Sequence, residues 1–400
     1  MSQKQLTYVI VQAGDTLAAI AKRYFTTVGT IARLNGLQKD AVPIPGTLLH
    51  VPKIPPKQEP KQKLFRPRIP RYAFAVHTGR EGVYPGSDKA LLKVGAEGLS
   101  GIFPVWFQPS PTEPWELQSF VTPDVIAATT AAARERNVQV WAMLTNSYYT
   151  GSVSSKEVAH QVMTADPDRL LNNLFATYTR CGLDGVLLDW FDLYADDHEL
   201  FTVFLFKMAD MCRRSGLKLA VNIPLFPDGE GRPTAALDLE LAGQLADLVC
   251  LLLNTEHRMY TGAGPLSSIS WTENGIRHAL EKGVPPHKLL LGVAGYAYDW
   301  KGRSETPEYL SFEGALNRAR QYRTNVQFDA KSQTPTCRYT DGSGAEHQVW
   351  FENTSSMSQK ITLVDRYGLA GITMWRLGVE DPGLWTLLRS RWNEVKKLNK

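Results

Sequence analysis

Eight short apolar segments recur between residues 72 and 375, and stretches with helical periodicity separate most of them. Strands that alternate with helices pair in parallel, and eight such units close into a (β/α)8 or TIM barrel of the α/β class. The predicted strands are Tyr72–Val76, Gly101–Phe107, Val138–Leu144, Gly185–Asp189, Leu217–Ile223, Leu248–Leu253, Leu289–Gly295 and Gly371–Trp375. The predicted helices include Pro123–Asn137, Asp168–Cys181, Leu200–Ser215, Thr272–Lys282 and Ser355–Tyr367.

The segment Phe328–Phe351 interrupts this alternation, because two strand-like stretches flank the turn residues Asp341 and Gly342. We expect a small hairpin inserted between the seventh and eighth strands. We therefore assign residues 72–400 to the barrel and its insertion.

A separate unit precedes the barrel at residues 5–53. Its pattern predicts a βααβ arrangement, with elements at Tyr8–Val11, Thr16–Tyr24, Thr27–Leu34 and Leu48–Val51. Residues 54–71 contain five prolines, six basic residues and one acidic residue, a net charge of +5 in a chain of net charge +4. Such a tract is typical of an extended, semi-rigid linker. Adhesion to an anionic polymer is the alternative.

Composition excludes several classes of protein. No run of about 18 apolar residues is present, which predicts no membrane span. Met1–Leu6 has no apolar signal-peptide core, so we expect synthesis in the cytoplasm without a signal peptide. The cysteines form no CxxC pair and are expected to be buried thiols: Cys181, Cys212, Cys250 and Cys337. We find no metal-ligand cluster, phosphate loop or catalytic serine or cysteine arrangement, and we expect no metal, no cofactor and no nucleic-acid partner.

The fourth predicted strand ends in acidic residues, which a buried strand has no ordinary packing reason to do. Side chains alternate along a strand, so Leu187, Asp189 and Phe191 share one face. Because sites in this fold lie at the carboxyl ends of the strands, Asp189 is a candidate catalytic residue.

The N-terminal unit resembles a LysM domain. The matching residues are Tyr8 and the valines of the first strand, Gly14-Asp15-Thr16-Leu17, Ile20-Ala21, Tyr24, Ile31, Asn35-Gly36-Leu37, Pro45-Gly46-x-Leu48 and Val51-Pro52. LysM domains bind glycans built from N-acetylglucosamine, chiefly peptidoglycan and chitin. The resemblance implies a shallow glycan groove formed by Gly14, Asp15, Thr16 and Leu17 and by Pro43, Ile44, Pro45 and Gly46.

The fourth strand resembles the signature of family 18 glycoside hydrolases, the chitinase family, whose pattern is Asp-Gly-x-Asp-x-Asp-x-Glu. Asp184, Gly185 and Asp189 match, whereas Leu187 replaces the first inner Asp and Phe191 stands at the position of the catalytic Glu. The family mechanism is substrate-assisted: the Glu protonates the glycosidic oxygen, and an Asp orients the attacking 2-acetamido group. Asp189 can still perform the second task, but Phe191 has no proton to donate.

Further stretches resemble the LysM-bearing glucosaminidases of bacterial spores, so that the resemblance spans nearly the whole chain. They are Leu289–Trp300, Arg338–Asp341, Val349–Glu352 and Tyr367–Trp375 with Leu377-Gly378. The resemblance places Trp375 under a sugar ring, because a flat indole matches the apolar face of a pyranose. Other implied substrate contacts are Tyr296, Asp299, Trp300, Trp106, Asn146, Tyr148 and Asn254, the last of which stands where the family usually has a tyrosine.

Three hypotheses follow. The first is a glycan-binding protein that has lost turnover, because it lacks the acid. The second is an active N-acetylglucosaminidase whose acid has moved to Asp192 or Glu256; Asp192 is expected to face away from the barrel lumen unless a β-bulge turns it inward. The third is a structural spore component that contacts no glycan. The resemblance favours a spore coat, cortex or cell-wall location and a peptidoglycan or chitin partner, and it leaves the oligomeric state open.

Overall fold

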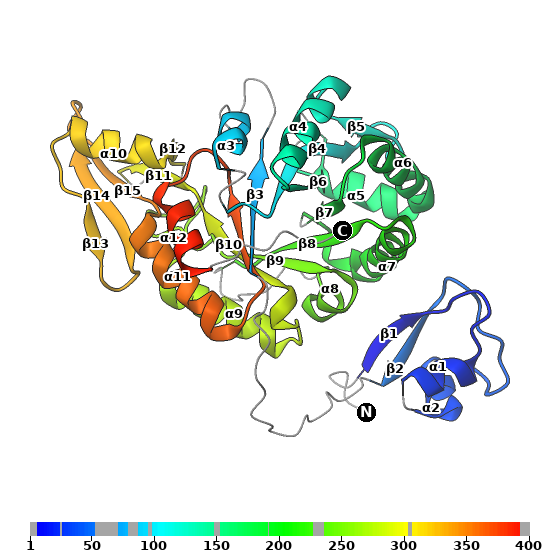
Figure 1. Ribbon diagram of the computed structural model, residues 1–400. Helices are drawn as coiled ribbons and strands as arrows, with labels where there is room; N and C mark the ends of the chain where they lie inside the picture. The colour runs from blue at the N-terminus through cyan, green and yellow to red at the C-terminus, as the bar shows by residue number, and fades with distance from the viewer. Residues whose placement is uncertain are drawn as a thin grey trace. The chain divides into compact units, whose positions relative to one another are not determined.

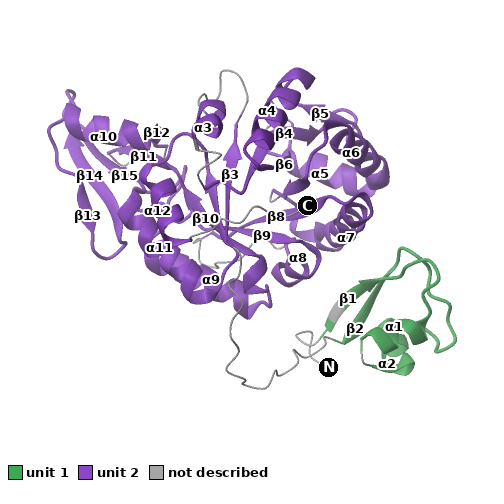
Figure 2. Cartoon of the chain, viewed as in Figure 1, with its two compact units in different colours: residues 1–67 green, residues 68–400 purple. Residues whose placement is uncertain are grey.

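The computed structural model describes residues 6–24, 26–52, 71–78, 87–94, 98–147, 153–190, 192–226, 236–302 and 306–392. The chain divides into two compact units, residues 1–67 and residues 68–400 (Figure 2). Phe191, Tyr148 and the tract 54–70 lie outside the described residues.

The first unit has the predicted βααβ order (Figure 1). Its strands β1 (Leu6–Ile10) and β2 (Leu48–Pro52) pair antiparallel, and helices α1 (Leu17–Arg23) and α2 (Val28–Leu34) connect them. Thr16 caps α1 and Thr27 caps α2 through their side chains. Asn35 joins the helices to β2, because its amide group donates to the carbonyls of Ile31 and His50 and accepts from the His50 N–H.

The second unit is a closed barrel of eight parallel strands, as predicted. Their order in the sheet is β3, β16, β10, β9, β8, β7, β6, β4, and a pairing of β3 with β4 closes the ring. The strands are β3 (Tyr72–His77), β4 (Gly101–Pro109), β6 (Gln139–Thr145), β7 (Gly185–Asp189), β8 (Lys218–Pro224), β9 (Leu248–Leu252), β10 (Leu289–Ala294) and β16 (Gly371–Trp375). The short strand β5 (Leu117–Ser119) pairs antiparallel with the end of β4.

Helices surround the barrel (Figure 1). They are α3 (Ser87–Val94), α4 (Pro123–Glu135), α5 (Ser155–Thr164), α6 (Pro167–Cys181), α7 (His198–Ser215), α8 (Leu239–Leu245), α9 (Ile269–Glu281), α11 (Thr354–Tyr367) and α12 (Gly383–Arg391), with short 3-10 turns η2 (Ala195–Asp197) and η3 (Pro286–Lys288). Inside the barrel, Phe74 stacks on Phe103 with ring centroids 4.6 Å apart. A Cβ at Gly101 would lie 2.2 Å from the Phe74 ring, so this packing requires glycine there. No helix among the described residues is long and apolar enough to cross a membrane.

The insertion before the last barrel strand is larger than the predicted hairpin. It is a five-stranded antiparallel sheet in the order β12, β11, β15, β14, β13, with helix α10 (Phe312–Gln321). The strands are β11 (Tyr296–Lys301), β12 (Glu308–Ser311), β13 (Gln327–Asp329), β14 (Thr334–Thr340) and β15 (Glu346–Trp350). The predicted turn at Asp341 does join β14 to β15. Tyr296–Lys301 belongs to this sheet because it pairs with β15 and β12 after the chain leaves β10.

A buried ion pair fixes the end of the insertion to the barrel's helical layer. Glu352 follows β15, Lys360 lies on α11, and their side chains are 3% and 1% exposed. The Lys360 ammonium donates to both carboxylate oxygens of Glu352, at 2.9 and 2.8 Å.

Candidate functional site

A cavity of about 450 Å³ opens at the carboxyl ends of the barrel strands, where sites of this fold lie. Barrel strands and the loops that follow them supply most of its wall, and residues of the insertion in and beside β11 and β12 supply the rest. The lining residues are Val76, Ser147, Asp189, Asn222, Leu252, Asn254, Met259, Gly292, Val293, Tyr296, Tyr298, Pro307, Tyr309, Thr373, Met374 and Trp375.

Asp189 is the acidic group of this cavity. It ends β7 and is 5% exposed. Asn222 Nδ2 donates to Asp189 Oδ1 at 2.7 Å, and Thr145 Oγ1 donates to Asp189 Oδ2 at 3.0 Å. Burial raises the pKa of the Asp189 carboxyl, and these two hydrogen bonds oppose that shift. Among the described residues that line the cavity, Asp189 carries the only carboxyl group.

The raised pKa of Asp189 predicts a pH-dependent contribution to stability. The folded protein holds this proton more tightly than the unfolded chain, whose Asp pKa is about 3.9. The contribution is therefore fully present below that pH and is lost as the pH rises through the higher pKa of the folded state. In Asp189→Asn, the free energy of unfolding should fall less between pH 4 and pH 7 than in the wild type. Urea unfolding at a series of pH values measures this difference, and a pH-independent difference would contradict it.

Tyrosines and one tryptophan form the aromatic wall of the cavity. Tyr296 stacks on Tyr309 with centroids 5.0 Å apart, and Tyr298 packs against Tyr296 edge to face. Tyr296 Oη donates to the Asn254 carbonyl at 3.3 Å and accepts from Asn254 Nδ2 at 3.5 Å. Burial raises the pKa of Tyr296 well above its ordinary value, so its hydroxyl keeps its proton. Trp375 ends β16 and is partly buried.

Sequence reasoning did not identify several of these residues. Asn222 lies on β8, the strand that follows β7 and Asp189. Its polar side chain within the apolar sequence of β8 is the feature that could have identified it. Thr145 likewise ends the strand before Asp189. Tyr298 and Tyr309 reach the cavity only because the insertion folds over the barrel mouth, for which the local sequence has no signal.

The two proposed relocated acids lie away from the cavity lining. The Asp192 carboxylate is 44% exposed and lies 3.7 Å from the Lys156 ammonium on α5. The Glu256 carboxylate accepts from the N–H and the hydroxyl of Ser268, the residue that caps α9. Neither side chain lines the cavity that holds Asp189.

The other predicted sugar contacts divide between two regions outside the cavity. Asp299 lies within the insertion, where its carboxylate accepts hydrogen bonds from Tyr339 and His347. Trp300, the next residue in the chain, is fully buried. Trp106 is fully buried in the layer between strands and helices. Asn146 is also fully buried, and its amide donates to the Asp192 carbonyl at 2.9 Å. These four side chains therefore do not line the cavity, and Tyr148 lies outside the described residues.

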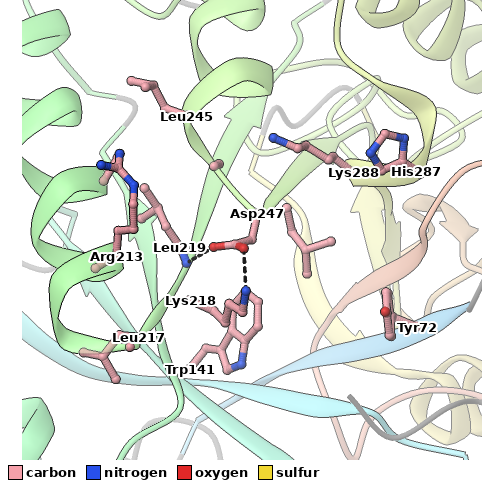
Figure 3. A pocket seen from close by; sticks show the side chains of 15 residues that line it. Tyr72, Trp141, Arg213, Leu217, Lys218, Leu219, Leu245, Asp247, His287 and Lys288 are labelled. Carbon is pink, nitrogen blue, oxygen red and sulfur yellow. Dashed lines mark hydrogen bonds and ion pairs between the residues drawn. The ribbon is translucent and has the colours of Figure 1, made fainter. Parts of the chain in front are cut away.

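A second cavity, of about 460 Å³, lies at the opposite end of the barrel, around the first residues of the strands (Figure 3). Asp247 there accepts from the Leu219 N–H at 3.0 Å and from Lys218 Nζ at 2.8 Å. Lys288 Nζ donates to the carbonyls of Gly243 and Gln244 at the end of α8. Asp247 is thus paired with Lys218, and the Lys288 ammonium is paired with carbonyls at the C-terminal end of α8. The cavity at the carboxyl ends of the strands is therefore the better candidate site.

One backbone hydrogen bond links the loop 42–46 to the segment that leads into the other half of the predicted LysM groove. The Gly46 N–H donates to the Val11 carbonyl at 2.8 Å, which sets the loop 42–46 beside the segment that leads to Gly14. Ile44 is 69% exposed, and Pro45, Gly14, Thr16 and Gly46 are also exposed. Leu17 and Pro43 are buried. The Asp15 carboxylate is engaged by the Gln12 N–H and by Arg23.

No group of three or more His, Cys, Asp and Glu side chains suited to a metal ion occurs in the part of the chain that the structure describes. The candidate site therefore consists of one buried carboxyl, amide groups and aromatic rings. This combination suits the binding of a neutral, hydroxyl-bearing ring compound, since aromatic faces cover its apolar surface and the polar groups orient it.

The family model for glycosyl hydrolases family 18 matches residues 128–380, more than half of the sequence. The chain belongs to glycosyl hydrolase family 18. A LysM domain model matches residues 9–52. As a family 18 member, the chain carries Asp189 at a position of the family's acidic signature, at the strand end where the cavity lies.

Similar proteins match most or part of the chain. The chain is 27% identical over 413 residues to a Bacillus subtilis (strain 168) protein named "Putative sporulation-specific glycosylase YdhD", covering 94% of this chain and 97% of that one. It is 32% identical over 237 residues to the cortical fragment-lytic enzyme of the same organism, covering 57% of this chain and 54% of that one. The crystal structure of the spore cortex-lytic enzyme SleL of Bacillus megaterium QM B1551 superposes with a TM-score of 0.70 at 24% identity, covering 96% of this chain and 86% of that one, which supports the fold.

Proposed function

We propose that this protein binds an N-acetylglucosamine-containing cell-wall glycan, spore peptidoglycan, through its LysM domain and its barrel cavity, and that it hydrolyses this glycan little or not at all. The proposal rests on one observation: the barrel has a cavity suited to a sugar, but its sequence lacks the glutamate that serves as the catalytic acid in the family pattern. Asp189 and the aromatic wall are present, whereas Phe191 occupies the position of the catalytic Glu in the family pattern.

The choice of glycan rests on the LysM domain and on the names of the similar proteins. The relatives named as cortical fragment-lytic enzymes and the SleL structures support a substrate in the spore cortex. We therefore propose the peptidoglycan of the spore or cell wall as the glycan, and chitin oligomers, which share its N-acetylglucosamine units, serve as soluble test ligands.

The loss of turnover follows from the chemistry of the leaving group. A sugar alkoxide is a poor leaving group, so the glycosidic oxygen must be protonated as the bond breaks, and a general acid typically contributes about 10²- to 10⁴-fold. Asp189, whose carboxylate oxygens accept hydrogen bonds from Asn222 and Thr145, would orient the acetamido group but is not the proton donor. Asp192 and Glu256 are engaged elsewhere, which argues against a relocated acid.

The test is incubation of the full chain with purified spore-cortex peptidoglycan, followed by pelleting and mass spectrometry of the supernatant. We expect the protein to pellet with the sacculi and to release no fragments. Deletion of residues 5–53 should weaken pelleting. Fragments that disappear in Asp192→Ala or Glu256→Ala would instead establish an active enzyme, and a protein that stays in the supernatant would contradict glycan binding.

Trp375→Ala should weaken the binding of a chitin oligomer by the barrel by about tenfold, because a buried sugar–indole contact of this kind contributes roughly 1–2 kcal/mol. Calorimetric titration of the wild type and the variant measures the change. Phe328→Ala is the matched control, since Phe328 is 47% exposed on β13 and does not line the cavity. Equal affinities for Trp375→Ala and the wild type would remove Trp375 from the site.

A further inference from the structure

A tight turn lies at the rim of the cavity, in the loop between β9 and α9. The Thr261 N–H donates to the Arg258 carbonyl at 3.1 Å, which makes Met259 and Tyr260 the two central residues of a β-turn. The Met259 side chain lines the cavity. Tyr260 is the next residue in the chain, so its backbone lies one residue from the cavity lining.

Tyr260 has a conformation that its residue type does not favour. Its φ is +72°, the left-handed region that the third position of a type II turn requires and that glycine usually fills. Its side chain is 74% exposed, so burial of the ring does not offset this strain. Strained backbone at an exposed aromatic residue points to a function for that side chain, because folding alone favours glycine or asparagine there.

The surrounding loop holds this turn in place. Thr261 Oγ1 accepts from the Arg258 N–H at 2.9 Å and donates to the Arg258 carbonyl at 2.8 Å. His257 Nδ1 lies 2.8 Å from the Gly262 carbonyl oxygen, and the Glu256 N–H donates to the Leu266 carbonyl at 3.1 Å. Glu256 in turn is fixed to Ser268. These hydrogen bonds hold the turn in a fixed conformation, and the Tyr260 side chain is exposed to solvent next to a residue of the cavity lining.

We infer that Tyr260 is the stacking platform of an outer sugar subsite, which binds a glycan unit beyond those held in the cavity. This inference rests on the proposed glycan binding by the barrel. An exposed aromatic face matches the apolar face of a pyranose and needs no polar partner behind it. Tyr260 is outside the cavity lining and follows the lining residue Met259, so we expect the subsite to serve long oligomers and not short ones.

The test compares a chitin disaccharide with a chitin hexasaccharide as ligands of the full chain. All ten tryptophans follow residue 105, and the LysM unit has none, so tryptophan fluorescence reports on the barrel alone. We expect Tyr260→Gly to weaken hexasaccharide binding by about tenfold and to leave disaccharide binding within about twofold of the wild type. Tyr260→Phe keeps the ring and should bind both ligands as the wild type does.

The outcomes separate this inference from the proposed function. A wild type that binds neither oligomer overturns glycan binding by the barrel and the outer subsite with it. A wild type that binds the hexasaccharide, together with a Tyr260→Gly variant of equal affinity, overturns the outer subsite alone. Thermal unfolding is the control for folding: glycine relieves the strain at φ +72°, so the midpoint of Tyr260→Gly should equal or exceed that of the wild type, and a lower midpoint would contradict the strain argument.

Discussion

Replacing Phe191 with glutamate is expected to raise the release of products from spore peptidoglycan by about 10²-fold or more. Phe191 stands two residues after Asp189, where the family pattern has its catalytic Glu. The substitution should supply a proton donor to a cavity that already holds Asp189, Asn222 and the aromatic wall. Mass spectrometry of soluble fragments, with the wild type run in parallel, measures the gain.

Two further variants make this test specific to the acid. Phe191→Gln has nearly the shape of the glutamate variant but no acidic proton, and it should stay at the wild-type level. Adding Asp189→Asn to Phe191→Glu should remove the gain, because the acetamido group is then no longer oriented by a carboxylate. If Phe191→Glu binds the glycan and yields no more product than Phe191→Gln, the missing acid is not what prevents turnover.

Lys360→Met is expected to lower the free energy of unfolding of the barrel unit by about 3–5 kcal/mol. The substitution leaves the Glu352 carboxylate, whose side chain is 3% exposed, without the ammonium that contacts both of its oxygens. A buried charge that loses its partner keeps its desolvation penalty, which is the source of the large effect. Urea unfolding followed by tryptophan fluorescence measures it.

The matched control for Lys360→Met is Arg320→Met, which removes an ion pair to Glu313 whose side chains are 63% and 62% exposed. Exposed pairs contribute about 0–1 kcal/mol, so this variant should remain close to the wild type. The double variant Glu352→Leu with Lys360→Met removes both buried charges and should recover most of the lost stability. A double variant as unstable as Lys360→Met would show that packing, not the orphaned charge, explains the loss.

The sequence by itself determined the repeating architecture. The eight barrel strands begin and end within one or two residues of their predicted positions. The reason is that the apolar runs, the helical periodicity and the caps are local properties, which neighbouring residues encode together. The same holds for the LysM unit, and for Asp189, whose place follows from the end of a parallel strand in a barrel.

Only the tertiary structure decided which side chains share the cavity. Asp299 and Trp300 follow Tyr296 closely in sequence, but β11 pairs with β15, which comes much later in the chain, and this pairing carries Asp299 to His347 while Tyr296 stays at the cavity. Asp192 and Glu256 were directed by Lys156 and Ser268, partners that no local pattern specifies. The direction of a side chain in the loops after the strands depends on hydrogen bonds and charges from other parts of the fold, and these partners become neighbours only when the chain folds.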